Sequence, residues 1–261
     1  LHEFGHGFAC KRFGKKEGSG GEVHTMGIMF LVFTPMPYVD ASSAWALRSK
    51  WKRMIVGAGG MYVELAVAAV AAIVWANTAP GSPIHALCYN MIFIAGVSTV
   101  LFNANPLLRY DGYYILSDLL EIPNLQQRSR EMLYFLVKKF AYGVRKPRNP
   151  AHSIGEAIWF VIYGLASTVY RVFICTAILL FIADKFFLIG TVLAVLSVAM
   201  WVFVPLGKFI HYLLSNPELE RTRVRAIAVT MVFFAAVIGA VGIYPAPDTW
   251  RLEGVAEPVD M

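Results

Sequence analysis

Long apolar stretches constrain this chain more than any other feature of its sequence. The chain has 261 residues, of which 57% are hydrophobic and only 15% charged, and its mean hydropathy is +0.58. A helix that crosses a bilayer needs about 20 apolar residues. Stretches of that kind occur at 53–77, 84–104, 156–183, 186–206 and 226–244. The sequence therefore predicts an all-α polytopic membrane protein rather than a soluble domain.

Two further segments belong to this picture. The chain opens with "LHEFGHGFAC", which we expect to be the second half of a helix that starts before Leu1, giving about six transmembrane helices, the first one truncated. Residues 27–40, "GIMFLVFTPMPYVD", are too short to span and contain Pro35 and Pro37. Irregular backbone survives at membrane depth only when buried against protein or lining a cavity. We expect a short re-entrant or β-hairpin segment beside the opening helix.

The basic residues predict an orientation. If the spans alternate, 20 of the 23 Lys and Arg residues fall in connections on one side, within 11–16, 48–53, 109–148 and 208–225. The positive-inside rule makes that side cytoplasmic and the C-terminus extracytoplasmic. Arg171 lies inside the stretch 156–183; it either faces the bundle interior or snorkels from a tilted helix, and snorkelling is the commoner case.

The net charge of +6 is explained by this topology and by contacts with the lipid bilayer. The basic clusters lack interleaved aromatic residues on a soluble face, so we expect no nucleic-acid partner. The cysteines, Cys10, Cys88 and Cys175, are scattered without a CxxC pair and predict neither a thiolate metal site nor a disulfide framework.

The opening segment contains the pattern His-Glu-x-x-His. On a helix His2 and His6 project from the same face and can meet one Zn²⁺, with Glu3 beside them as a general base. Two histidines and a glutamate in an apolar segment are costly unless coordinated or otherwise paired. The other histidines, His24, His85, His152 and His211, have no partner at ligand spacing.

A catalytic zinc needs a third protein ligand and one open position. The candidate is Asp111 in "FNANPLLRYDGYY", which follows the stretch 84–104 as that stretch returns toward the cytoplasmic side. Pro106 ends the helix, and Gly112 permits a tight turn beside the carboxylate. Taken without the first motif, Asp111-Gly112 would be read as an ordinary turn.

Together the two motifs resemble the site-2 protease family of intramembrane zinc metalloproteases. The matching residues are His2-Glu3-x-x-His6 and Asn103-x-x-Pro106-x-x-x-x-Asp111-Gly112, and the resemblance covers residues 1 to 120. It implies that His2, His6 and Asp111 bind Zn²⁺ and that Glu3 activates water. It also implies that Asn103 and Pro106 present a substrate strand, and that the segment after the first helix is a membrane-embedded β-hairpin.

The sequence departs from that family in three places. The second core helix of the family often carries Gly-Pro-x-x-Asn, whereas this chain has Gly60-Met61-Tyr62-Val63-Glu64. Glu64 either lies near the zinc pocket, where it contributes hydrogen bonds or a second carboxylate, or faces a polar groove between helices. Leu108 replaces a familiar second proline, which puts the strand-presenting geometry in doubt. The tail "TWRLEGVAEPVDM" resembles the start of an adaptor strand of membrane-fusion proteins in secretion systems, which would imply a bacterial source.

These observations divide the chain into a catalytic membrane core (1–120), a basic cytoplasmic loop (121–152), additional transmembrane helices (153–245) and the start of an extracytoplasmic region (246–261). We expect a zinc endopeptidase of the bacterial inner membrane that cleaves membrane-embedded peptides or proteins on the cytoplasmic side. One alternative is a membrane component of a secretion or efflux assembly in which catalysis is secondary or lost. Another is a zinc hydrolase that acts on a non-peptide substrate.

Overall fold

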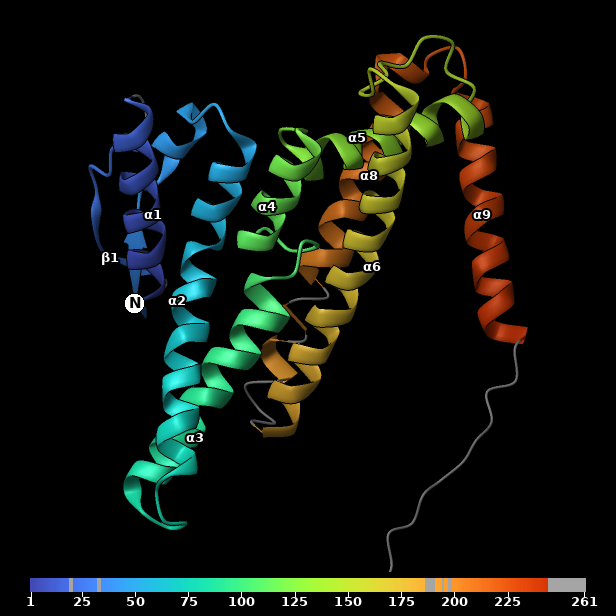
Figure 1. Cartoon of the computed structure of the whole chain (residues 1–261). Coiled ribbons are helices and arrows are strands. Elements are labelled where there is room, and N and C mark those ends of the chain that lie inside the picture. Colours follow the sequence, from blue (N-terminus) through green and yellow to red (C-terminus); the bar gives the residue numbers. More distant parts are fainter. Residues whose placement is uncertain (19–20, 32–33, 186–190, 194, 197–198, 244–261) are drawn as a thin grey trace, which may run out of the picture. The chain divides into compact units, whose positions relative to one another are not determined.

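The computed structural model describes residues 1–243 except 19–20, 32–33, 186–190, 194 and 197–198 (Figure 1). The chain divides into two compact units. The first contains Leu1–Tyr134 and Asn149–Ala194, and the second Phe135–Arg148 and Val195–Met261. The predicted extracytoplasmic segment, 246–261, lies outside the described residues.

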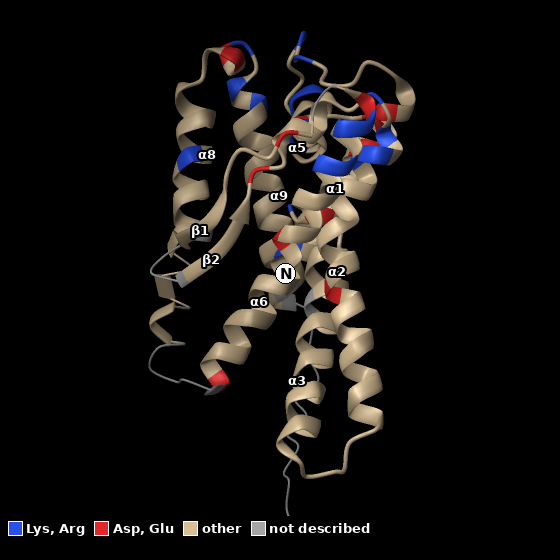
Figure 2. Ribbon diagram, turned by 60° about the vertical axis from the view of Figure 1, so that its left-hand side comes forward, with Lys and Arg blue, Asp and Glu red and all other residues tan. Residues whose placement is uncertain are grey.

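The first unit is built from helices and one small sheet. Its helices are α1 (His2–Glu17), η1 (Ser42–Ala46), α2 (Lys50–Ala76), α3 (Pro83–Val97), the π-helical segment η2 (Ser98–Asn103), α4 (Asp111–Leu120), α5 (Leu125–Leu136) and α6 (Ile154–Lys185). Glu17 near the end of α1 forms an ion pair of 2.5 Å with Lys52 near the start of α2. The two helices therefore run antiparallel, and their basic ends gather together (Figure 2).

The second unit contains the remaining helices. They are η3 (Val137–Ala141), η4 (Ala199–Phe203), α8 (Val204–Ser215), η5 (Pro217–Leu219) and α9 (Arg223–Ile243). Leu213, Leu219 and Ala226 form a small buried cluster with Tyr142. Arg225 at the start of α9 donates hydrogen bonds to the carbonyl oxygens of Phe140 and Ala141, which lie at the end of η3.

Four of the expected spans are present as helices. Among the described residues, four helical segments are long and apolar enough to cross a membrane: Lys50–Ala76, Pro83–Asn103, Ile154–Asp184 and Arg223–Ala240. The protein therefore has the composition of a polytopic membrane protein. α1 has 16 residues, fewer than the roughly 20 that a span needs. The fifth expected stretch, 186–206, lies partly outside the described residues.

The segment after α1 forms a β-hairpin. β1 (Met26–Leu31) pairs antiparallel with β2 (Thr34–Val39), with Met29 opposite Met36. The amide of Asp40 donates to the carbonyl of Thr25, so Asp40 bonds to the partner strand. In an antiparallel pair such residues alternate with residues whose backbone N–H and C=O groups point away from the partner. Pro35 and Pro37 are of this second kind. Proline has no N–H, so the outer edge of β2 lacks two donors.

The basic segment 121–152, expected as a loop, contains α5. Its helix is held against α6 within the first unit, because Arg128 forms an ion pair of 3.1 Å with Glu156 and its guanidinium lies over the ring of Phe160. Basic residues of this segment therefore take part in helix packing as well as in the charge pattern that predicts topology.

α1 and α2 cross with their backbones almost in contact. A Cβ added to Gly5 would lie 2.2 Å from the carbonyl oxygen of Gly59, and a Cβ added to Gly59 would lie 2.6 Å from that of Gly5. Small residues permit such close crossings in membranes, where helices associate by van der Waals packing rather than by the hydrophobic effect. Cys10 and Val56 are buried near the same contact with Leu47.

α4 is fixed against the segment that directly follows η2. A Cβ on Gly112 would lie 2.4 Å from the carbonyl oxygen of Ala104, so glycine is required for this close approach. Nε of Arg53 in α2 donates to Oδ1 of Asp118 in α4 at 2.7 Å, and Nη1 of Arg53 donates to the carbonyl of Leu47. Because both side chains are largely buried, this pair anchors α4 to α2.

We expect Gly59→Ala to lower the free energy of unfolding by about 1–3 kcal/mol, because the added methyl overpacks a backbone contact. Gly96→Ala in α3 is the matched control, since a Cβ there meets nothing within 4 Å. Chemical unfolding of both purified variants in detergent measures the difference. Equal stability of the two variants would contradict the close crossing.

Candidate metal centre

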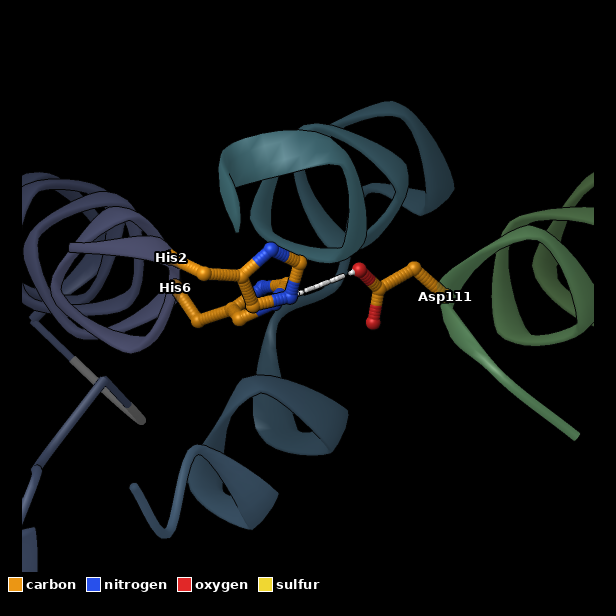
Figure 3. A group of neighbouring side chains, drawn as sticks. All are labelled: His2, His6 and Asp111. Carbon is orange, nitrogen blue, oxygen red and sulfur yellow. Dashed lines mark hydrogen bonds and ion pairs between the residues drawn. The ribbon is translucent and has the colours of Figure 1, made fainter. Parts of the chain in front are cut away.

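Two histidines of α1 and one aspartate of α4 point toward a common centre (Figure 3). His2 and His6 lie four residues apart on the face of α1 that is turned to α2, and their Nε2 atoms are 3.0 Å apart. Oδ2 of Asp111 lies 3.1 Å from Nε2 of His2 and 3.4 Å from Nε2 of His6. Within the described part of the chain, these three residues form the one group with metal-ligand spacing.

The triangle of donor atoms fits a small tetrahedral cation. A zinc ion with nitrogen and oxygen ligands at about 2.0–2.1 Å would hold its ligand atoms about 3.3 Å apart. The three observed separations, 3.0, 3.1 and 3.4 Å, lie close to that value. Two imidazole nitrogens and one carboxylate oxygen are also ligands that zinc accepts, and they leave a fourth position for water or substrate.

The ring of His6 is held by the backbone of α2. Nδ1 of His6 lies 2.8 Å from the carbonyl oxygen of Val56, and since a carbonyl only accepts, Nδ1 carries the proton and donates it. In the neutral ring the lone pair is then on Nε2, which is directed at the centre. A ligating histidine usually has its other ring nitrogen bound in this way, which fixes both tautomer and orientation.

Glycine at position 60 makes room for both rings. A Cβ added there would lie 2.5 Å from Nε2 of His2 and 2.5 Å from Nε2 of His6. The backbone of α2 therefore forms the floor of the centre. A larger residue at position 60 would have to displace both imidazoles.

Asp111 is the first residue of α4, where a carboxylate interacts favourably with the helix dipole. The structure thus places it in a helix rather than in the turn that the Asp-Gly pair suggests. Its Oδ2 is buried and has no well-aligned hydrogen bond among the described residues. Burial alone would raise the pKa of Asp111, but the nearby imidazoles of His2 and His6 hold that pKa below its ordinary value. The carboxylate is therefore aimed at the centre, where Oδ2 lies within 3.4 Å of both imidazoles.

Glu64 stands behind His2. Its Oε1 lies 3.2 Å from Nδ1 of His2, close enough for attraction, although the two atoms are not aligned as a hydrogen bond. The hydroxyl of Thr99 donates to Oε2 of Glu64, and so does the amide of Asn103, at 3.2 Å. Glu64 therefore lies beside a candidate ligand and also lines the cleft described below, so both alternatives left by the sequence remain compatible with its position.

A cleft of about 600 Å³ opens beside the three donors. Glu3 lines it together with His2, His6 and Asp111, so the proposed base and the candidate ligands face the same space. Its other walls come from β2, η1, α4 and the residue that precedes α4, through Met36, Pro37, Trp45, Tyr114 and Tyr110. Their exposed aromatic and apolar side chains suit an apolar ligand that reaches the polar centre.

Of the two residues expected to position a substrate, Asn103 and Pro106, the first lines the cleft and the second does not. Asn103 lines the cleft, but its amide also donates to Glu64. Pro106 does not line the cleft; its carbonyl accepts a hydrogen bond of 3.0 Å from the hydroxyl of Tyr163 in α6. Sequence reasoning missed Thr99 and Tyr163, because a hydroxyl in an apolar helix gives no signal until its partner is known.

We expect Gly60→Ala to weaken zinc binding by about 10–100-fold, the range seen when groups that orient metal ligands are lost. The added methyl would displace both imidazoles, while the helix itself would tolerate alanine. Zinc retained after dialysis against a graded chelator series measures the effect, with Gly96→Ala as control. Unchanged retention in Gly60→Ala would show that the rings do not meet a metal over this glycine.

Comparison of the chain with models of known families, with curated proteins and with solved structures found no match. The functional proposal therefore rests on the geometry of the three donors and of the cleft beside them.

Proposed function

We propose that the protein is a zinc-dependent intramembrane endopeptidase, similar to site-2 proteases, in which His2, His6 and Asp111 hold Zn²⁺. The observation that carries the proposal is the triangle of two Nε2 atoms and one carboxylate oxygen, with Glu3 lining the same cleft. This group lies in a chain whose long apolar helices match a membrane environment. Such polar side chains are expensive in an apolar protein unless they serve a common site.

Bound zinc would supply a Lewis acid that polarises a carbonyl and lowers the pKa of water. The other roles belong to the residues of the chain. Glu3 accepts the proton of the attacking water and delivers it to the leaving amine. His6, anchored to the carbonyl of Val56, and Asp111, anchored through α4, keep their donor atoms in place during the reaction.

A peptide substrate is supported by the walls of the cleft. A peptide bond must be presented in extended form, because a helix hides its carbonyl groups. β2 contributes Met36, Pro37 and Val39 to the cleft, yet its outer edge lacks donors at Pro35 and Pro37. An extended substrate beside β2 would therefore donate to strand carbonyls and place its side chains against the apolar walls of the cleft, rather than form a complete ladder.

The placement of the site toward the cytoplasmic side belongs to the same proposal. The basic residues Lys11, Lys15 and Lys16 of α1 lie toward the end of that helix, and Lys50 and Lys52 begin α2. Basic residues at such helix ends are typical of the cytoplasmic side. The bacterial inner membrane and a connection to secretion or efflux components are supported by sequence resemblance alone.

We expect Glu3→Gln to reduce cleavage of a membrane-embedded peptide by about 10²–10⁴-fold, the usual contribution of a general base. Zinc content should stay at the wild-type level, because glutamine preserves the shape of the side chain and all three ligands remain. Cleavage is measured in proteoliposomes containing the purified protein and a model transmembrane peptide. Cleavage at the wild-type rate by Glu3→Gln would remove Glu3 from the mechanism.

Asp111→Ala should lose zinc, since two imidazoles alone make a weak site. Metal analysis of the purified variant tests this, with Asp184→Ala as a control for the loss of a carboxylate elsewhere in the chain. Unchanged zinc in Asp111→Ala would exclude it as a ligand. A wild type that binds no zinc would instead favour the alternative of an assembly component in a secretion or efflux system.

A further inference from the structure

We propose that Glu64 is a positioning residue that orients His2, and that Thr99 and Asn103 serve this centre by holding Glu64. The inference rests on the proposed function, because it assigns Glu64 to the same zinc site. It gives Asn103 a different task from the substrate-presenting role that the family resemblance implies.

The two candidate imidazoles are supported by different means. Nδ1 of His6 has a backbone partner, the carbonyl of Val56 at 2.8 Å. Nδ1 of His2 has no aligned partner among the described residues; the acceptor nearest at hand is Oε1 of Glu64 at 3.2 Å. A ligating histidine needs an acceptor at its second nitrogen to keep the correct tautomer, so Glu64 supplies for His2 what the backbone supplies for His6.

The donors around Glu64 favour this assignment. Oε2 accepts from the hydroxyl of Thr99 and from the amide of Asn103, so one carboxylate oxygen is engaged by donors on η2. The other oxygen, Oε1, is the one turned to His2. Only a carboxylate accepts from both sides at once; an asparagine or glutamine would have to give one side an N–H group.

The π-helical segment η2 presents both donors. The amide of Ala104 donates to the carbonyl of Thr99 at 2.7 Å, five residues back, which is the π-helical pattern. Thr99 is almost fully buried, and its hydroxyl and the amide of Asn103 meet the same carboxylate oxygen. A segment of this kind inside an apolar helix is frequent at functional sites, and here it converges on Glu64.

The contact between His2 and Glu64 needs only a small change in the orientation of the His2 ring to become a hydrogen bond. The 3.2 Å separation between Nδ1 of His2 and Oε1 of Glu64 is a hydrogen-bond distance, and only the alignment is missing. Functional hydrogen bonds are often poorly aligned before the site is loaded and tighten on loading. Rotation of the His2 ring would align the pair while Nε2 stays directed at the centre.

The experiment compares Glu64→Ala, Glu64→Gln and Thr99→Val in the full chain, with Thr168→Val as the matched control. Thr168 donates to the carbonyl of Gly164 within α6, so its loss tests the general cost of removing a threonine hydroxyl that is hydrogen-bonded within an apolar helix. The first readout is the zinc dissociation constant from chelator competition. The second is the nitrogen NMR spectrum of the metal-free protein labelled in histidine, which reports the tautomer of each ring.

We expect Glu64→Ala to weaken zinc binding by about 10–100-fold and to change the Nδ1 signal of His2 more than that of His6, whose Nδ1 keeps its own partner, the carbonyl of Val56. Glu64→Gln should restore part of the affinity, because its carbonyl can accept from Nδ1 of His2. Thr99→Val should weaken binding less than Glu64→Ala, and Thr168→Val should bind like wild type. If Glu64→Ala fails to fold, Glu64→Gln and Thr99→Val decide the question.

Two outcomes separate this inference from the proposed function. Wild type that binds zinc, together with Glu64 variants of equal affinity and an unchanged His2 spectrum, overturns the role of Glu64 and leaves the proposed function intact. Wild type without zinc affinity overturns the proposed function and this inference with it.

Discussion

The backbone contact between α1 and α2 is the constraint on which the rest of the first unit depends. Gly5 and Gly59 let the two helices touch without intervening side chains. Because of that closeness, the imidazole of His6 reaches the carbonyl of Val56, and both rings lie over Gly60. In a lipid environment, where helices do not gain from burying apolar surface against each other, such close packing is itself a source of association energy. Two bulky residues at this crossing would remove both the packing and the floor of the site.

The polar side chains of the site stabilise one another in a protein that otherwise offers apolar surroundings. Thr99 and Asn103 satisfy one oxygen of Glu64, and the other oxygen faces His2. Leaving any of these groups without a partner would cost several times what a normal hydrogen bond contributes. Two atoms of the site lack an aligned partner among the described residues: Oδ2 of Asp111, which faces the centre, and Nδ1 of His2, which faces Glu64. The first is placed to receive a further group, and the second lies beside the acceptor that could hold the ring.

The sequence carries part of this arrangement and not the rest. The spans at 53–77 and 84–104 follow from apolar length alone, and helices occupy both. The shared face of His2 and His6 follows from helical periodicity. Whether Asp111 would reach them depends on the close approach of Gly112 to Ala104 and on the pair of Arg53 with Asp118, which join segments far apart in the chain. Likewise, the orientation of Glu64 depends on the π-helical turn at Thr99. The residues of that segment, "STVLFN", contain no pattern that predicts such a turn.

Asp111 comes from a helix that begins roughly 100 residues after the one carrying the histidines. A metal held by all three would act as a cross-link between distant segments, and it would restrict the unfolded chain by closing a very long loop. For a covalent link of that span the loss of chain entropy corresponds to about 4–5 kcal/mol. The ion that takes part in catalysis would then also stabilise the first unit by holding α1 to α4. Without the metal, α1 and α4 would remain connected through α2, which contacts α1 at Gly59 and binds α4 through Arg53.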